Sequence, residues 1–82
     1  MSVSSNLVFI DDSGNETTLI ESSVYGNSRR RKIVVQDEEA AQEVASLFLE
    51  QQDYKIFSFD YQEPYLRVYT DEGVKLFYLK PV

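Results

Sequence analysis

Carboxylates and one short run of cations are the side chains with which this chain could do chemistry. Its 82 residues include 14 Asp and Glu and 8 Lys and Arg, and they include no histidine and no cysteine. The chain therefore lacks the usual general base near neutral pH, the thiol nucleophile and the common zinc ligands. We expect no catalytic residue, no metal site and no cofactor, and hence a protein that is not an enzyme.

The adjacent pairs Asp11-Asp12 and Glu38-Glu39 come closest to paired carboxylates for acid–base catalysis. They fall in a predicted loop and a predicted helix start, and neither position indicates a cleft. The first pair opens the stretch DDSGNE at 11–16, which lacks the twelve-residue spacing and closing glutamate of an EF-hand loop. We interpret this stretch as a hairpin turn, with a weak cation site as the alternative.

The basic run is formed by four consecutive residues, Arg29, Arg30, Arg31 and Lys32, in a chain of net charge −6. Four cations together can bind nucleic-acid phosphates. However, a nucleic-acid-binding domain usually spreads its positive charge along a face or groove, and residues 33–54 contain no cation. Because the segment 33–36 is too short to carry the run far from the carboxylates at 37–43, we expect these two charge blocks to neutralise each other at least in part, within one molecule or between two copies. Nucleic-acid binding is the alternative.

Residues 37–52 form the one convincing helix of the sequence. Asp37 is placed to cap its first turn, and Glu38 and Glu39 complement the positive end of the helix dipole. At 100° per residue, one arc collects the apolar side chains Ala40, Ala41, Val44, Ala45, Leu47 and Phe48. Leu49 is the exception, because its angle places it among the polar residues. The pattern predicts a helix lying on a sheet.

The polar side of this helix carries the acidic ridge, which we define as Glu39, Glu43 and Glu50. The helix dipole does not account for Glu43 or Glu50, and no lysine or arginine follows either of them at i+4. Solubility explains such a ridge. The alternative is an acidic mimic of nucleic acid, whose carboxylates would block the groove of a basic partner.

Strands account for most of the remaining chain. Residues 6–11 and 17–25 predict a first hairpin, 33–35 a short buried strand, and 55–62, 65–70 and 74–80 three further strands. The fold class that follows is α+β, with one helix packed on a mainly antiparallel sheet in the order β-β-β-α-β-β-β. We expect residues 1–82 to form a single domain.

Gly73 indicates a three-residue loop at 71–73 between the last two strands, because such a loop ends in a left-handed residue. This register makes one hairpin face nearly all apolar. It gives the other face Tyr65, Arg67, Tyr69, Lys75 and Phe77. Tyrosine and arginine are enriched in protein interfaces, so this aromatic face is a candidate protein-binding surface. The alternatives are coverage by the N-terminal hairpin and stacking on unpaired bases.

The missing catalytic residues and the aromatic face together predict a small non-enzymatic protein-binding module of a regulatory, inhibitory or accessory kind. We expect it to self-associate, as a homodimer, and to bind a further protein partner. The alternatives are a nucleic-acid-binding protein that uses the basic run with strand aromatics, and the acidic mimic. No stretch is a signal peptide or is long and apolar enough to span a membrane, so we expect a cytoplasmic protein. No segment carries a motif that assigns it to a known family.

Overall fold

A computed structural model describes residues 4–82 of the chain. The elements are β1 (Ser5–Ile10), β2 (Glu16–Thr18), α1 (Glu21–Tyr25), β3 (Val34–Val35), α2 (Glu38–Glu50), β4 (Ile56–Gln62), β5 (Tyr65–Thr70) and β6 (Gly73–Pro81). The strands form one antiparallel sheet in the order β2-β1-β6-β5-β4, and β3 pairs with β1 beside β2. The predicted α+β class is confirmed.

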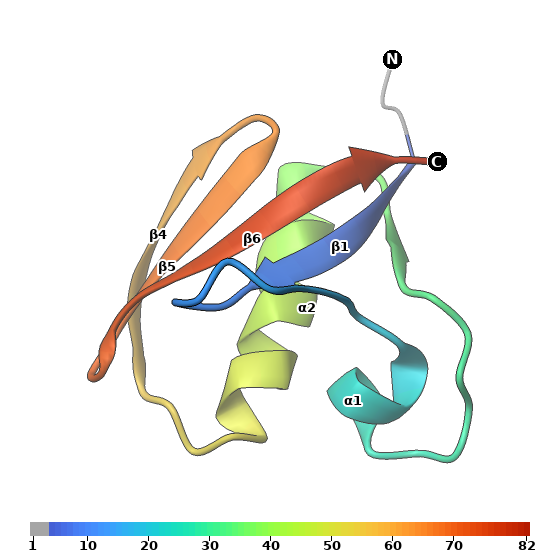
Figure 1. Ribbon diagram of the computed structural model, residues 1–82, viewed down its shortest axis with the longest axis horizontal. Coiled ribbons are helices and arrows are strands. Elements are labelled where there is room, and N and C mark those ends of the chain that lie inside the picture. The colour runs from blue at the N-terminus through green and yellow to red at the C-terminus, as the bar shows by residue number, and fades with distance from the viewer. Residues whose placement is uncertain (1–3) are drawn as a thin grey trace.

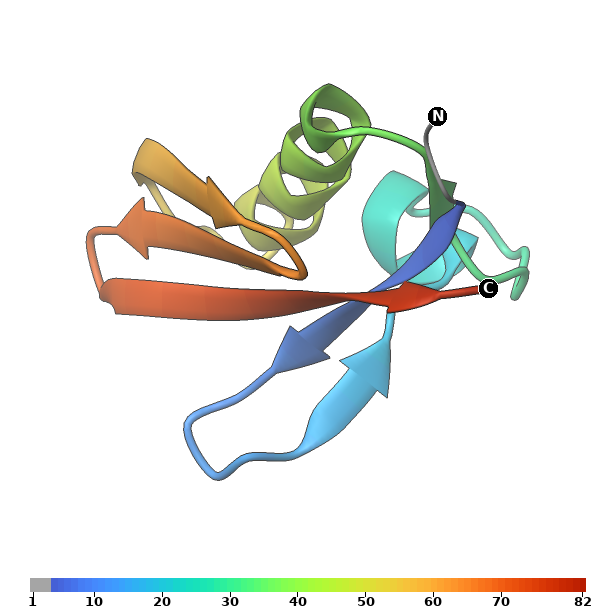
Figure 2. The same ribbon diagram turned by 90° about the horizontal axis from the view of Figure 1, so that it is seen from above.

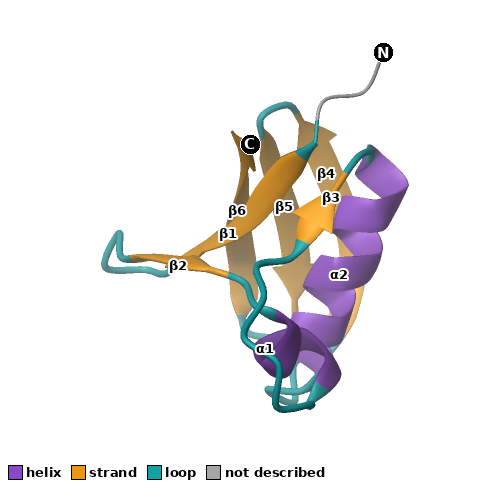
Figure 3. Ribbon diagram, turned by 90° about the vertical axis from the view of Figure 1, so that its right-hand side faces the viewer, coloured by secondary structure: helices purple, strands orange, loops and turns teal. Residues whose placement is uncertain are grey.

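Both helices lie on one face of the sheet (Figures 1 and 2). α2 crosses the strands, and α1 lies beside α2 near the β3 end of the sheet (Figure 3). The tip of the β1–β2 hairpin projects on the side of the sheet opposite α2 (Figure 2). One face of the sheet is therefore packed against helices, and the other is not.

The core fills the space between the sheet and α2. Phe9, Phe48 and Phe77 form its aromatic centre, with ring centroids 5.3 to 6.1 Å apart. Such tilted and edge-on pairs add to the stabilisation from buried area. The fully buried side chains around them come from every layer: Leu7, Leu19, Val24, Val35, Leu49, Leu66 and Val68.

The predicted helix is confirmed as α2. The Asp37 carboxylate accepts a hydrogen bond of 2.8 Å from the Ala40 N–H and caps the first turn. The placement of Leu49 on the polar side was wrong, because this side chain is completely buried. At 100° per residue Leu49 lies only about 40° from the buried Ala45, so the buried strip of α2 extends further round the helix than predicted.

The strand predicted at 17–25 is wrong beyond Thr18, because α1 occupies Glu21–Tyr25. The first two helical N–H groups, of Glu21 and Ser22, donate to the carbonyls of Arg31 and Arg29 at 2.9 Å. Gly26 then ends the helix in the left-handed conformation, with φ of 72°. The observed order is therefore β-β-α-β-α-β-β-β, with one helix more than predicted.

The loop between β5 and β6 contains two residues, Asp71 and Glu72, and the predicted three-residue loop was wrong. Thr70 pairs with Gly73, although Gly73 does have the expected positive φ, of 103°. The one-residue difference shifts β6 against β5 and exchanges its faces. Phe77, now opposite Leu66, is fully buried on the helix side. Lys75 lies opposite the buried Val68 and faces the same side.

This register predicts that one truncation in β6 lowers the stability strongly and that another has little effect. Phe77→Ala should lower the free energy of unfolding by about 3–5 kcal/mol, because it removes a buried ring from the core. Val74→Ala, at a half-exposed position, should change it by less than about 1 kcal/mol. Urea denaturation followed by circular dichroism measures both values. Equal effects of the two truncations would contradict the two-residue loop.

Candidate functional site

The sheet face turned away from the helices carries apolar and aromatic side chains. We define the open face by its members on β1, β5 and β6: Ile10, Tyr65, Arg67, Tyr69, Val74, Leu76 and Tyr78. The cross-strand register brings them together, since Tyr65 lies opposite Tyr78, Arg67 opposite Leu76 and Tyr69 opposite Val74. Within residues 4–82, no helix lies over these residues (Figure 2).

The side chains of the open face are partly ordered by one another. The Tyr65 and Tyr78 rings are packed with centroids 5.4 Å apart. Val8, the residue opposite Tyr78 on β1, is only 2% exposed although it lies outside the main core cluster. Tyr65, Tyr69 and Val74 nevertheless stay 40%, 37% and 48% exposed. The face therefore has a packed base and an apolar surface that water still contacts.

The predicted aromatic face is corrected in part. Tyr65, Arg67 and Tyr69 lie together on the open face as expected, whereas Phe77 belongs to the core. Lys75 is also on the other side, where its Nζ lies 4.7 Å from the centre of the Tyr54 ring. Val74, Leu76 and Tyr78, which replace them, were missed because the wrong loop length had assigned β6 in the opposite phase.

The basic run is held beside α1 by Glu21. The Arg31 Nε lies 2.8 Å from Glu21 Oε2, and the Arg29 Nη1 lies 3.9 Å from Glu21 Oε1. The expected pairing of the run with the carboxylates at 37–43 within one chain is wrong, because two of its cations bind Glu21, a carboxylate that the sequence had not indicated. Arg30 and Lys32 form no ion pair within the described part of the chain. None of the α2 carboxylates reaches the run.

The acidic ridge on α2 is exposed along its length. Glu39, Glu43 and Glu50 form no ion pair with any residue between 4 and 82. Negative charge also surrounds the start of the helix, as the nearby phenol of Tyr61 indicates. Partial burial raises the pKa of Tyr61, and the charges of Glu63, Glu38 and Asp37 raise it further. Several carboxylates are therefore close together at this end of the molecule.

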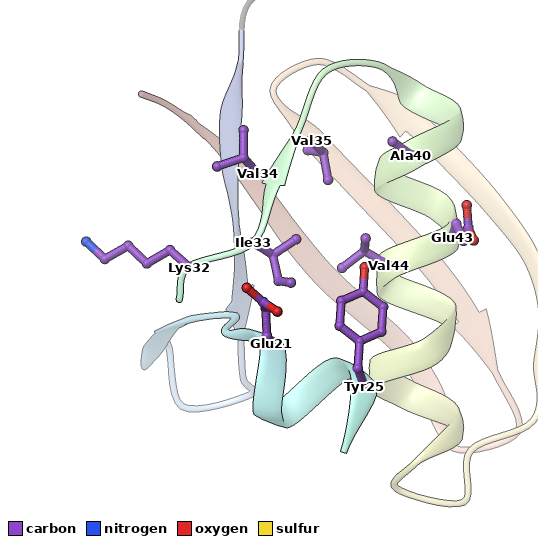
Figure 4. Close-up of a pocket in the computed structure, with 9 residues that line it drawn as sticks. All are labelled: Glu21, Tyr25, Lys32, Ile33, Val34, Val35, Ala40, Glu43 and Val44. Atoms are coloured by element: carbon purple, nitrogen blue, oxygen red, sulfur yellow. The ribbon is translucent and has the colours of Figure 1, made fainter. Parts of the chain in front are cut away.

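A cavity of about 320 Å³ lies between α1, β3 and α2 (Figure 4). Ile33, Val35 and Val44 point into it, together with the ring of Tyr25. Its polar lining comes from Glu21, Lys32 and Glu43, of which Glu21 already binds Arg31. Lys32 and Val34 point away from α2 in the same view. The cavity lies beside β3, and more of its lining surface is polar than apolar.

The interpretation of the acidic stretch 11–16 as a hairpin turn is confirmed, because residues 11–15 connect β1 to β2 and Glu16 begins β2. The Asp11 Oδ1 accepts hydrogen bonds of 2.9 Å from the Ser13 and Asn15 N–H groups. These bonds, led by the one from Asn15, lower the pKa of Asp11. Across residues 4–82, no group of three or more Asp or Glu side chains is arranged to hold a metal ion.

Comparison with known proteins found no matching family model, no matching curated protein and no matching solved structure. In the described residues, no helix has the length and apolar character needed to cross a membrane.

The Glu21–Arg31 ion pair predicts a coupling energy between these two residues that should be absent between Glu21 and Arg30. A double-mutant cycle with Glu21→Ala and Arg31→Ala should give about 0.5–1 kcal/mol, a value near the top of the range for surface pairs because Glu21 is mostly buried. The matched cycle with Arg30→Ala should give a coupling near zero. Urea denaturation at low salt provides both values, and equal couplings would contradict the observed pairing.

Tyr61 predicts a loss of stability at alkaline pH. Since its pKa is raised in the folded chain, the unfolded chain loses this proton first, from about pH 10 upward. The free energy of unfolding should therefore fall as the pH rises above 10, and the Tyr61→Phe variant should lose less over the same interval. Tyr25→Phe serves as the exposed control. Identical alkaline profiles for the native chain and Tyr61→Phe would contradict this assignment.

Proposed function

We propose that this chain is a small non-enzymatic protein-binding module that holds a partner protein on its open face. The observation that carries the proposal is a packed apolar and aromatic sheet surface from which both helices are absent. Large exposed apolar patches are uncommon on monomeric proteins and commonly mark interaction sites, and Tyr65, Tyr69 and Val74 are the exposed apolar side chains of this face. A regulatory, inhibitory or accessory role is consistent with such a module.

The composition of the open face favours a protein as the ligand. Tyrosine combines a large contact area with few rotatable bonds, so its immobilisation costs little conformational entropy. Tyr65 and Tyr78 already pack against each other, which lowers that cost further. Arg67 lies between these rings and the Tyr69–Val74 pair, where it can donate to acceptors on the partner. We infer a partner surface that is apolar at its centre and offers carboxylate or carbonyl oxygens around it.

The charge of the molecule supports recognition by shape and apolar contact at this face. Most of the carboxylates lie on α2 and in loops, whereas Arg67 is paired in register with Asp60 of β4. The open face is therefore close to neutral within a chain of net charge −6. Long-range attraction to basic partners would come from the helix side of the molecule.

Nucleic-acid binding is the second candidate, because Tyr65, Tyr69 and Tyr78 also form a platform on which unpaired bases could stack. The net charge of −6 opposes it, and Glu21 already neutralises Arg29 and Arg31. The phosphate-binding term that supplies most of the affinity in such complexes is therefore weak here.

Affinity capture with the immobilised chain from its native host tests the proposal. A partner held by the open face should bind Tyr69→Ala/Val74→Ala at least about tenfold more weakly, because interface truncations at buried aromatic positions commonly cost more than 1.4 kcal/mol. Tyr25→Ala is the matched control, since Tyr25 is an exposed tyrosine on α1. Its affinity for the same partner should be unchanged.

Nuclease treatment separates the two candidates in the same experiment. Capture that survives nuclease and weakens only in the open-face variant supports the protein-binding module. Capture that disappears with nuclease supports the nucleic-acid candidate, and equal capture by all three chains would contradict both. Circular dichroism of each variant shows whether its fold is retained.

A further inference from the structure

The sequence around β3 has a two-fold charge pattern centred on Val34. Arg29, Arg30 and Arg31 precede it, and Glu39, Glu38 and Asp37 follow it at the same distances. If two such segments run antiparallel with Val34 opposite Val34, Arg31 lies opposite Asp37 and Arg30 opposite Glu38. The segment is therefore complementary to a second copy of itself.

β3 is paired on one side only within residues 4–82. Val34 and Val35 pair with Asn6 and Ser5 of β1, and no other strand pairs with β3. The preceding residues continue the same bonded side: the Ile33 N–H donates to the Leu19 carbonyl at 3.0 Å, and the Arg31 carbonyl accepts from Glu21. Residues 31–35 thus form an extended edge that is fixed along one side.

The other side of this edge offers backbone hydrogen-bonding groups. Successive residues of an antiparallel strand present their N–H and C=O groups to opposite sides. Since Arg31 and Ile33 bond inward, the groups of Lys32 and Val34 point outward. The buried side chains of Ile33 and Val35 hold the backbone in this position. Such an edge is a ready template for pairing with another strand.

Nothing in the described part of the chain covers this edge. β3 lies on the surface of the side shown in Figure 3, and Val34 is 52% exposed. The cavity of about 320 Å³ between β3 and α2 leaves the edge approachable from the α2 side (Figure 4). Tyr25, 53% exposed, lines the same cavity. Exposed apolar side chains therefore accompany the unpaired backbone.

The charges that flank the edge also lack ion pairs within the described part of one molecule. Arg30 and Lys32 on one side of Val34, and Asp37, Glu38 and Glu39 on the other, form no ion pair among residues 4–82. Among residues 4–82 the two sets do not pair with each other. An antiparallel second copy would bring both sets together twice.

We propose that a second copy of this chain binds here, by antiparallel pairing of β3 with β3 about a two-fold axis through Val34. The outward N–H and C=O groups of Val34 in each copy bond to those of the other, and those of Lys32 bond to Gln36. The two exposed Val34 side chains become cross-strand neighbours. Arg30 of each copy lies beside Glu38 of the other, so the same contact is formed twice, as a two-fold interface requires. This surface is separate from the open-face residues that define the proposed function.

Charge reversal tests this interface, and mixing two complementary variants should restore the dimer. Sedimentation equilibrium at low salt should show a dimer of the native chain that dissociates as salt rises. Arg30→Glu places like charges at both contacts of the dimer, and Glu38→Arg does the same with the opposite sign. Each variant alone should dimerise about tenfold more weakly, since two surface pairs change from attraction to repulsion. An equimolar mixture of the two variants should recover the native affinity, because opposite charges meet at both contacts of the mixed dimer.

Two exposed positions away from β3 provide matched controls. Lys55→Glu, next to β4 at the other edge of the sheet, changes the net charge as Arg30→Glu does, and Glu50→Arg changes it as Glu38→Arg does. Both should dimerise like the native chain, and their mixture should gain nothing. The proposal is overturned if the native chain stays monomeric at low salt, if Arg30→Glu and Glu38→Arg dimerise normally, or if their mixture shows no recovery.

Discussion

One constraint governs the structure: the described residues form too little helix to cover both faces of the sheet. The chain has one 13-residue helix, about 20 Å long, and one helix of 5 residues, and both pack on the same side of six strands. The side chains that face them form the core around Phe77. The side chains on the other face must be compatible with water in the free chain, and tyrosines and Arg67 meet this requirement while keeping apolar area available for a partner.

The sequence predicted those parts of the fold that local patterns determine. The periodicity of residues 38–50 and the capping position of Asp37 locate α2, and the turn-rich stretch 11–16 locates the first hairpin. The prediction failed where contacts between residues distant in the sequence determine the structure. α1 depends on the carbonyls of Arg29 and Arg31 for its first hydrogen bonds. These distant contacts are not visible in the local sequence, where the β-branched residues predicted a strand. Leu49 was misplaced because the buried strip of α2 extends further round the helix than the pattern indicated.

The candidate site was predicted in part, and the reason lies in a single turn. Gly73 has a positive φ in either loop, so its presence could not distinguish two loop residues from three. The β5 members Tyr65, Arg67 and Tyr69 were assigned to one face regardless of the loop, whereas every β6 assignment depended on it. The basic run was predicted to be neutralised, but Glu21 could not be identified as its partner until α1 was known.

The central claim is that the open face is free in the isolated chain and is the surface that a protein partner covers. Covalent labelling of tyrosine, read residue by residue by mass spectrometry, tests it most directly. We expect Tyr65 and Tyr69 to be labelled in the free chain and protected in the complex with the captured partner, while the labelling of Tyr25 is the same in both. Protection of Tyr65 and Tyr69 in the free monomer, or their full labelling in the complex, would contradict the claim.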